Sequence, residues 1–191
     1  QGTVLYLALE DDESRLQRRM FRMFGVEGTN SLHFATNAKM IGSGLDEQLE
    51  KFIREHSDTK LIIVDTLQKV REVVNDSYSY SSDYEVIGKL KQFADRYGVC
   101  VLIVHHTRKQ PAGDSFEMIS GTTGLLGCAD GALLMQKEKR TNSKATLEVV
   151  GRDQPDQRLY LSKDQESLVW GLDHAENELW KQPPDPVLEA V

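Results

Sequence analysis

Residues 3–25 read TVLYLALEDDESRLQRRMFRMFG, an apolar run that ends in acidic residues and passes directly into a helical pattern. Val4–Leu9 is almost continuously apolar, which is typical of a β-strand that is covered on both faces. Apolar residues then recur at helical spacing over residues 16–24, and Gly25 is suited to end that helix. The stretch therefore predicts a strand that delivers carboxylates to its carboxyl end and continues into a helix.

The same alternation of short apolar strands and amphipathic helices continues along the chain. Further strands are predicted at residues 32–35, 61–64 and 99–104, with helices at residues 45–53 and 86–97 between them. Strands that alternate with helices form a mostly parallel sheet flanked by helices, joined by right-handed crossovers. The fold class predicted for this part of the chain is therefore α/β.

The pattern changes towards the C-terminus, where strand candidates follow one another closely. They lie at residues 132–136, 145–150, 158–161 and 167–170, a spacing that favours antiparallel hairpins added at one edge of the sheet. Residues 173–191 are rich in proline and are predicted to be a tail or linker. The predicted organisation is a core over residues 1–172 followed by this tail.

Composition limits the class of protein. At 191 residues, with 39% hydrophobic and 28% charged residues, the chain is typical of one globular domain with a sizeable core. No apolar run approaches the roughly 20 residues of a membrane span, so no membrane partner is expected. Cys100 and Cys128 lack metal-type spacing and are interpreted as reduced thiols of a cytoplasmic protein. A formal charge of −7 argues against a wholly basic nucleic-acid module but is compatible with local basic loops.

Polar residues end three of the predicted strands: Glu10, Asp65 and the His105–His106 pair. In a parallel α/β sheet, ligands bind at the carboxyl ends of the strands. Residues 61–66, LIIVDT, match the Walker B pattern of four apolar residues followed by an aspartate. An acid on a rigid strand tip can hold the water shell of Mg²⁺ beside the phosphates of a nucleotide. Taken alone, the pattern equally fits a buried strand whose aspartate caps the next turn.

The other polar residues at these strand ends also allow more than one interpretation. Glu10 could orient and deprotonate a water for attack on a γ-phosphate, whereas Asp11 and Asp12 are better explained as acids at a helix N-terminus. One of the two histidines could touch the γ-phosphate, or the pair could be one solvated and one packed side chain. A metal ion shared by both histidines is disfavoured, because adjacent residues on a strand point to opposite faces.

Two polar loops, at residues 71–82 and 107–120, follow the ends of strands and could grip single-stranded nucleic acid by stacking and charge. The residues predicted to contact nucleic acid are Arg71, Tyr78, Tyr80, Arg108 and Lys109. The same composition also fits ordinary surface loops. Arg152, between a predicted strand and a turn, is either a solvent-facing turn residue or, in a ring, an arginine finger for a neighbour's nucleotide. Arg140 is a weaker candidate for that role.

A nucleotide site of this kind needs a glycine-rich loop and a lysine, G-x-x-x-x-G-K-[ST], and the sequence contains no such motif. The strand-end segments nevertheless occur in an order that resembles the RecA-like ATPases of the plasmid RepA hexameric helicase group. The resemblance covers roughly residues 2–172 and rests on VLYLALEDDESRLQRR, LIIVDTLQKV, VLIVHHTRK, SGTTGLLGCADGALLM and VVGRD. In that group the Walker A strand, loop and helix precede the segment that matches TVLYLALED. The resemblance therefore implies a fragment that lacks the Walker A unit.

The resemblance also implies which residues carry the chemistry. Glu10 matches the water-activating glutamate, and Asp65 matches the Walker B aspartate that holds Mg²⁺ through water. Thr66 is assigned with these two residues to nucleotide binding. His106, in preference to His105, matches the position that senses the γ-phosphate.

The implied protein is a replicative DNA helicase or DNA-maintenance motor that hydrolyses ATP, with Mg²⁺, between subunits of a ring. Arg152 falls near the basic residues that act between subunits in that family. The expected partners are further copies of the chain, as a hexamer, and single-stranded DNA in the central channel. Without Walker A, the isolated chain is expected to be inactive.

Two functions of other classes remain open from the sequence. One is a non-catalytic regulatory or DNA-binding module that kept the RecA-like fold and lost turnover, which would explain the missing lysine. The other is a metal-dependent phosphoesterase that uses Glu10, Asp65 and the histidines. A Walker A motif encoded within about 50 residues upstream would favour the ATPase.

Overall fold

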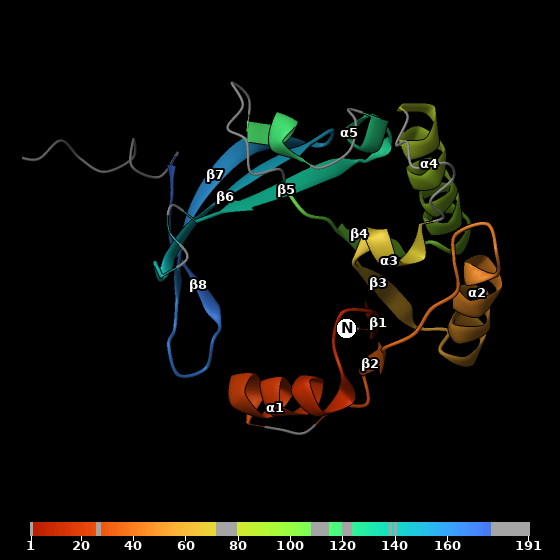
Figure 1. Ribbon diagram of the computed structural model, residues 1–191, viewed down its shortest axis with the longest axis horizontal. Coiled ribbons are helices and arrows are strands. Elements are labelled where there is room, and N and C mark those ends of the chain that lie inside the picture. The colour runs from red at the N-terminus through yellow and green to blue at the C-terminus, as the bar shows by residue number, and fades with distance from the viewer. Residues whose placement is uncertain are drawn as a thin grey trace, which may run out of the picture. The chain divides into compact units, whose positions relative to one another are not determined.

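The computed structural model describes residues 2–25, 28–71, 80–107, 115–119, 124–137, 139 and 141–176. The chain divides into two compact units between Ala129 and Asp130. The sequence pattern predicted a single core over residues 1–172. Each unit contains its own four-stranded sheet (Figure 1). Among the described residues, no helix combines the length and the apolar character that crossing a membrane requires.

The first unit contains the predicted parallel sheet. Its strands are β1 (Thr3–Ala8), β2 (Leu32–Ala35), β3 (Thr59–Asp65) and β4 (Cys100–Val104), in the spatial order β2-β1-β3-β4. Each strand is parallel to its neighbours. All four carboxyl ends therefore lie along one edge of the sheet, which confirms the α/β prediction and fixes where a site can form.

Helices and turns connect these strands. They are α1 (Glu13–Phe24), α2 (Leu45–Glu55), α3 (Leu67–Val70), α4 (Tyr80–Tyr97), the 3₁₀ turn η1 (Ser115–Met118) and α5 (Gly124–Cys128). Helix α4 begins earlier than the apolar pattern indicated, because its first turn carries Asp83, a fully buried acid that pairs with Arg71. An apolar stripe could not reveal a turn that is buried through an ion pair.

The core lies on one face of the parallel sheet. Side chains of β1 and β3 that point to this face pack with α2 and α4; they are Leu5, Leu7, Ile62 and Val64, against Leu45, Leu49, Leu90 and Phe93. Successive side chains of a strand point to opposite faces. Tyr6 therefore projects to the other face, and so does Asp65, which pairs with Ala8 across the β1–β3 ladder.

The second unit is an antiparallel sheet in which each strand pairs with the next. Its strands are β5 (Gly131–Gln136), β6 (Lys144–Gly151), β7 (Gln154–Lys163) and β8 (Trp170–Ala175). These are the successive hairpins that the sequence predicted, but within the described residues they form a sheet of their own and do not extend an edge of the parallel sheet, because each strand pairs with its neighbour in sequence. The last strand starts at Trp170, where the pattern ended, and continues into the residues expected to form the tail. Its pairing with β7 runs to Ala175, opposite Leu159, because backbone hydrogen bonding does not need an apolar side chain at every position.

Helix α1 has a defined start and end. Asp12 lies before its first turn with an extended backbone, and its side chain accepts a hydrogen bond from the backbone N–H of Arg15 at 2.8 Å. Gly25 ends the helix at φ 69°, in the left-handed region that favours glycine. The helix boundaries thus follow from the two capping residues.

We expect Asp12→Ala to lower the free energy of unfolding by about 1 kcal/mol, because it removes the N-cap acceptor. The melting temperature, followed by circular dichroism, should fall by about 2–4 °C. Asp12→Asn keeps a capping oxygen and should melt close to the parent protein. An unchanged melting temperature in Asp12→Ala would contradict the capping role.

Candidate functional site

Three polar strand ends meet along the carboxyl edge of the parallel sheet. The ladders pair Ala8 with Asp65 and Asp65 with Val104, so β1, β3 and β4 end at the same level. The backbone N–H of Leu9 donates to the carbonyl of Asp65 at 2.8 Å, which joins the ends of β1 and β3. We call the edge formed by Glu10, Asp65, Thr66 and His106 the rim. The structure thus brings together the residues predicted from the sequence.

Glu10 is the centre of the rim. Its Oε1 accepts a hydrogen bond from the Thr66 hydroxyl at 3.1 Å, and its Oε2 lies 4.0 Å from Nε2 of His106. The side chains of His106 and Glu10 are 68% and 44% exposed, so both can reach a bound molecule. Thr66 is buried, so its hydroxyl holds Oε1 of Glu10 from the protein side. Oε2 is left beside His106.

The two histidines differ in their placement. His106 is exposed and faces Glu10, whereas His105 is half-buried. This agrees with the alternation of side chains at the end of a strand. The geometry favours His106 as the residue that can contact a ligand on the rim, and its role as a sensor stays a prediction.

Asp65 is held by Tyr6, a residue that sequence reasoning did not single out. The Tyr6 hydroxyl donates to Oδ2 of Asp65 at 2.6 Å. Burial, reinforced by the hydrogen bond to Asp65, raises the pKa of Tyr6 well above its usual range, so the hydroxyl stays protonated as a donor. A lone tyrosine in an aliphatic strand was the available signal, but only the strand register shows what its hydroxyl reaches.

The donor set suits a magnesium ion held beside a nucleotide. Mg²⁺ keeps several waters and uses one or two carboxylates together with substrate phosphates. Asp65 supplies a carboxylate whose Oδ1 accepts no hydrogen bond from the described residues. Those same residues include no cluster of three or more His, Cys, Asp or Glu suited to an all-protein metal site. The Asp65 carboxylate thus fits the one or two protein ligands that Mg²⁺ takes beside a nucleotide.

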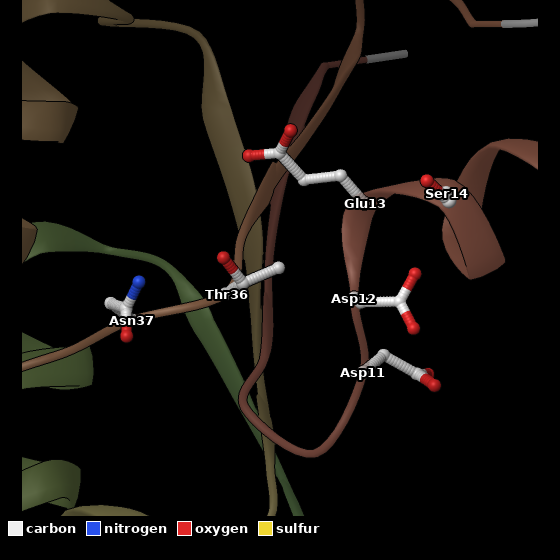
Figure 2. Close-up of a pocket in the computed structure, with 6 residues that line it drawn as sticks. All are labelled: Asp11, Asp12, Glu13, Ser14, Thr36 and Asn37. Carbon is white, nitrogen blue, oxygen red and sulfur yellow. The ribbon is translucent and has the colours of Figure 1, made fainter.

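The other acids after β1 have structural partners, as the sequence indicated. Asp11 binds Arg15 and Arg19, at 2.7 Å and 2.9 Å, and Asp12 caps α1. An open depression of about 440 Å³ lies beside them. Figure 2 shows its lining residues: Asp11, Asp12, Glu13, Ser14, Thr36 and Asn37. In this view the carboxylates of Asp11 and Asp12 point away from Thr36 and Asn37. Asp11 and Asp12 therefore have structural partners that explain their positions without a ligand.

The predicted nucleic-acid residues have mixed outcomes. Tyr78, Arg108 and Lys109 lie outside the described residues, as does Arg140, and Tyr80 is the first residue of α4. Arg71 was predicted to lie in a loop that contacts nucleic acid, but its side chain is buried. It is 3% exposed and forms an ion pair with Asp83. From the sequence, a basic residue after a strand can lie in a surface loop or in a buried ion pair. The buried Asp83 on α4 determines that Arg71 lies in an ion pair.

Arg152 belongs to the second unit, in the turn between β6 and β7. Its backbone N–H donates to the carbonyl of Asp130 at 3.0 Å, and its Nη1 lies 3.4 Å from Oδ1 of the same residue. Both side chains are exposed. The turn placement matches the prediction, and action on a neighbour's nucleotide stays a prediction.

Solved structures show the same fold. One of them, an ATPase domain, is similar with a TM-score of 0.72 and 13% identity, over 88% of this chain and 74% of that one. A DnaB-like replicative helicase, described with its interactions with primase, has a TM-score of 0.72 and 12% identity, over 88% of this chain and 51% of that one. The RadB recombinase has a TM-score of 0.57 and 12% identity, over 87% of this chain and 77% of that one.

The chain spans about half the length of the DnaB-like helicase. At these identities the likeness shows the fold alone, and that fold is RecA-like, as predicted. No curated protein matches the sequence. A family model described as an AAA domain matches residues 1–112, more than half of the 191 residues. The chain therefore belongs to the AAA domain family.

Proposed function

We propose that this chain is the hydrolytic part of a RecA-like ATPase, from a replicative DNA helicase or a related DNA-maintenance motor. The observation that carries the proposal is the rim, where Glu10, Asp65 and His106 end neighbouring parallel strands. Its acids are of the kind that ATP hydrolysis needs: one beside the attacking water and one beside the metal. Membership of the RepA helicase group is the finer part of this proposal.

Each rim residue has a distinct task in this proposal. Glu10 accepts the proton of the attacking water, held for that purpose by the Thr66 hydroxyl. Asp65 would hold the water shell of Mg²⁺, and the ion would supply positive charge to the phosphates during hydrolysis. His106 contacts the γ-phosphate. Because His106 lies close to Glu10, loss of that phosphate can change the position of the Glu10 side chain.

The exposure of the site supports an assembly of several subunits in this proposal. The rim is open to solvent at Glu10 and His106, as expected where a second subunit completes a nucleotide site. We therefore propose a hexameric ring in which Arg152 reaches a neighbour's nucleotide. We also propose that single-stranded DNA is bound by the segments that contain Tyr78, Arg108 and Lys109. Cys100 and Cys128 are free thiols, which fits the reducing cytoplasm as the location.

The test is phosphate release from ATP by the full-length protein, with and without single-stranded DNA. We expect Mg²⁺-dependent turnover that rises when DNA is added. Nucleotide binding without turnover would instead indicate a regulatory module with this fold. Metal-dependent hydrolysis of a simple phosphoester, with no need for a nucleotide, would indicate a phosphoesterase.

A further inference from the structure

The two oxygens of the Asp65 carboxylate have different surroundings. Oδ2 accepts a hydrogen bond from the Tyr6 hydroxyl at 2.6 Å. Oδ1 receives none from the part of the chain that the structure describes, and no described lysine or arginine pairs with Asp65. The Asp65 carboxylate is thus fixed through Oδ2, and Oδ1 is available to accept a hydrogen bond from a ligand or from metal-bound water.

Tyr6 is held in place from two sides. It pairs with Phe34 across the β1–β2 ladder, and the two rings lie 5.6 Å apart at a tilt of 42°. On its other side the register places Asp65 opposite Ala8, two positions further along the same face of β1. On that side the Tyr6 hydroxyl lies 2.6 Å from Oδ2 of Asp65.

We propose that Tyr6 is a positioning residue whose hydroxyl fixes the orientation of the Asp65 carboxylate and thereby presents Oδ1 to the water shell of Mg²⁺. The inference rests on the proposed function, which assigns Asp65 to the metal. The terminal torsion of an aspartate is broad, so an unheld carboxylate would sample many orientations. A second residue that hydrogen-bonds a carboxylate in a metal site typically strengthens metal binding by 10–100-fold.

The chemical nature of the donor supports this role. A tyrosine hydroxyl is neutral, so it orients the carboxylate without cancelling the negative charge that attracts a cation. An arginine or lysine in the same place would hold the carboxylate equally well and would repel the ion. A partner that only stabilised a half-buried acid could be either neutral or positively charged.

The test compares Tyr6→Phe with the parent in the full-length protein. Phe keeps the ring that packs on Phe34 and removes only the hydroxyl. We expect binding of Mn²⁺ in the presence of ADP, measured by electron paramagnetic resonance, to weaken by about tenfold. In ATP hydrolysis, the loss should fall on the Mg²⁺ concentration that gives half-maximal turnover rather than on turnover at saturating Mg²⁺. Tyr97→Phe, the same deletion beside Phe93 on α4, should leave both quantities unchanged.

Asp65→Asn separates this inference from the function on which it rests. In that background, Tyr6→Phe should cause no further loss of Mn²⁺ affinity, because its target carboxylate is gone. If Asp65→Asn itself leaves Mn²⁺ binding intact, the metal role of Asp65 fails and the Tyr6 inference fails with it. If Asp65→Asn weakens binding and Tyr6→Phe does not, only the Tyr6 inference is overturned. Equal losses from Tyr6→Phe in both backgrounds would show a merely structural effect and overturn it as well.

Discussion

Glu10→Gln in the full-length protein is expected to lower ATP turnover by about 10²–10⁴-fold, the range that a positioned general base contributes. Glutamine has the same shape and keeps an oxygen that can accept the Thr66 hydrogen bond, which is 3.1 Å long in the parent. It cannot take a proton from water. The variant should therefore fold and bind ATP normally while failing in the chemical step.

The matched control for Glu10→Gln is Asp12→Asn. It makes the same carboxylate-to-amide change in a nearby acid, which caps α1 rather than facing the rim. Turnover, measured as phosphate release, should be unchanged in Asp12→Asn, and binding of a fluorescent ATP analogue should be unchanged in both variants. If turnover survives in Glu10→Gln, the assignment of the base is wrong, although the rim could still bind nucleotide.

Arg71→Ala is expected to have the largest effect on stability, a loss of about 3–5 kcal/mol in the free energy of unfolding. Arg71 and Asp83 are 3% and 0% exposed, so removal of one partner leaves a buried charge without compensation. The pair joins the end of α3 to the first turn of α4. Helices α1 to α5 all belong to the first unit, so denaturant unfolding should be followed by helical circular dichroism.

The double variant Arg71→Met/Asp83→Leu is the control for this prediction. It replaces both charges by apolar side chains of similar size, a change that is often neutral when a buried ion pair is removed as a whole. Most of the stability lost in Arg71→Ala should return. A different outcome is diagnostic: if Arg71→Ala weakens binding of single-stranded DNA and leaves the unfolding midpoint unchanged, Arg71 acts on nucleic acid as the sequence first indicated.

The rim was predictable because it depends on local patterns combined with one general rule. Each apolar run ends at a recognisable residue, and parallel strands place their carboxyl ends on the same edge. Glu10, Asp65 and the histidines could therefore be grouped before any coordinates were known. The resemblance favoured His106 over His105, and the structure supplies the geometry: His106 is exposed and lies 4.0 Å from Glu10, because a shift of one residue at a strand end moves a side chain to the other face.

Arg71 shows where local reasoning fails. The segment that follows it, residues 75–82, is polar, so Arg71 was interpreted as the start of a surface loop. The acid that buries it lies on another helix, and the intervening segment contains no pattern that indicates the pair. Burial of a charged group depends on a partner, and partners distant in sequence are invisible to periodicity.

The sequence by itself determined the order of strands and helices and the polar residues at the strand ends, because the spacing of apolar residues is a local property of the chain. Only the tertiary structure decided that Tyr6 holds Asp65, that Thr66 orients Glu10 and that Arg71 is buried against Asp83. Each of these pairs joins different strands, helices or turns. Their contacts are set by strand register and by the burial of polar groups, which arise only when the whole domain folds.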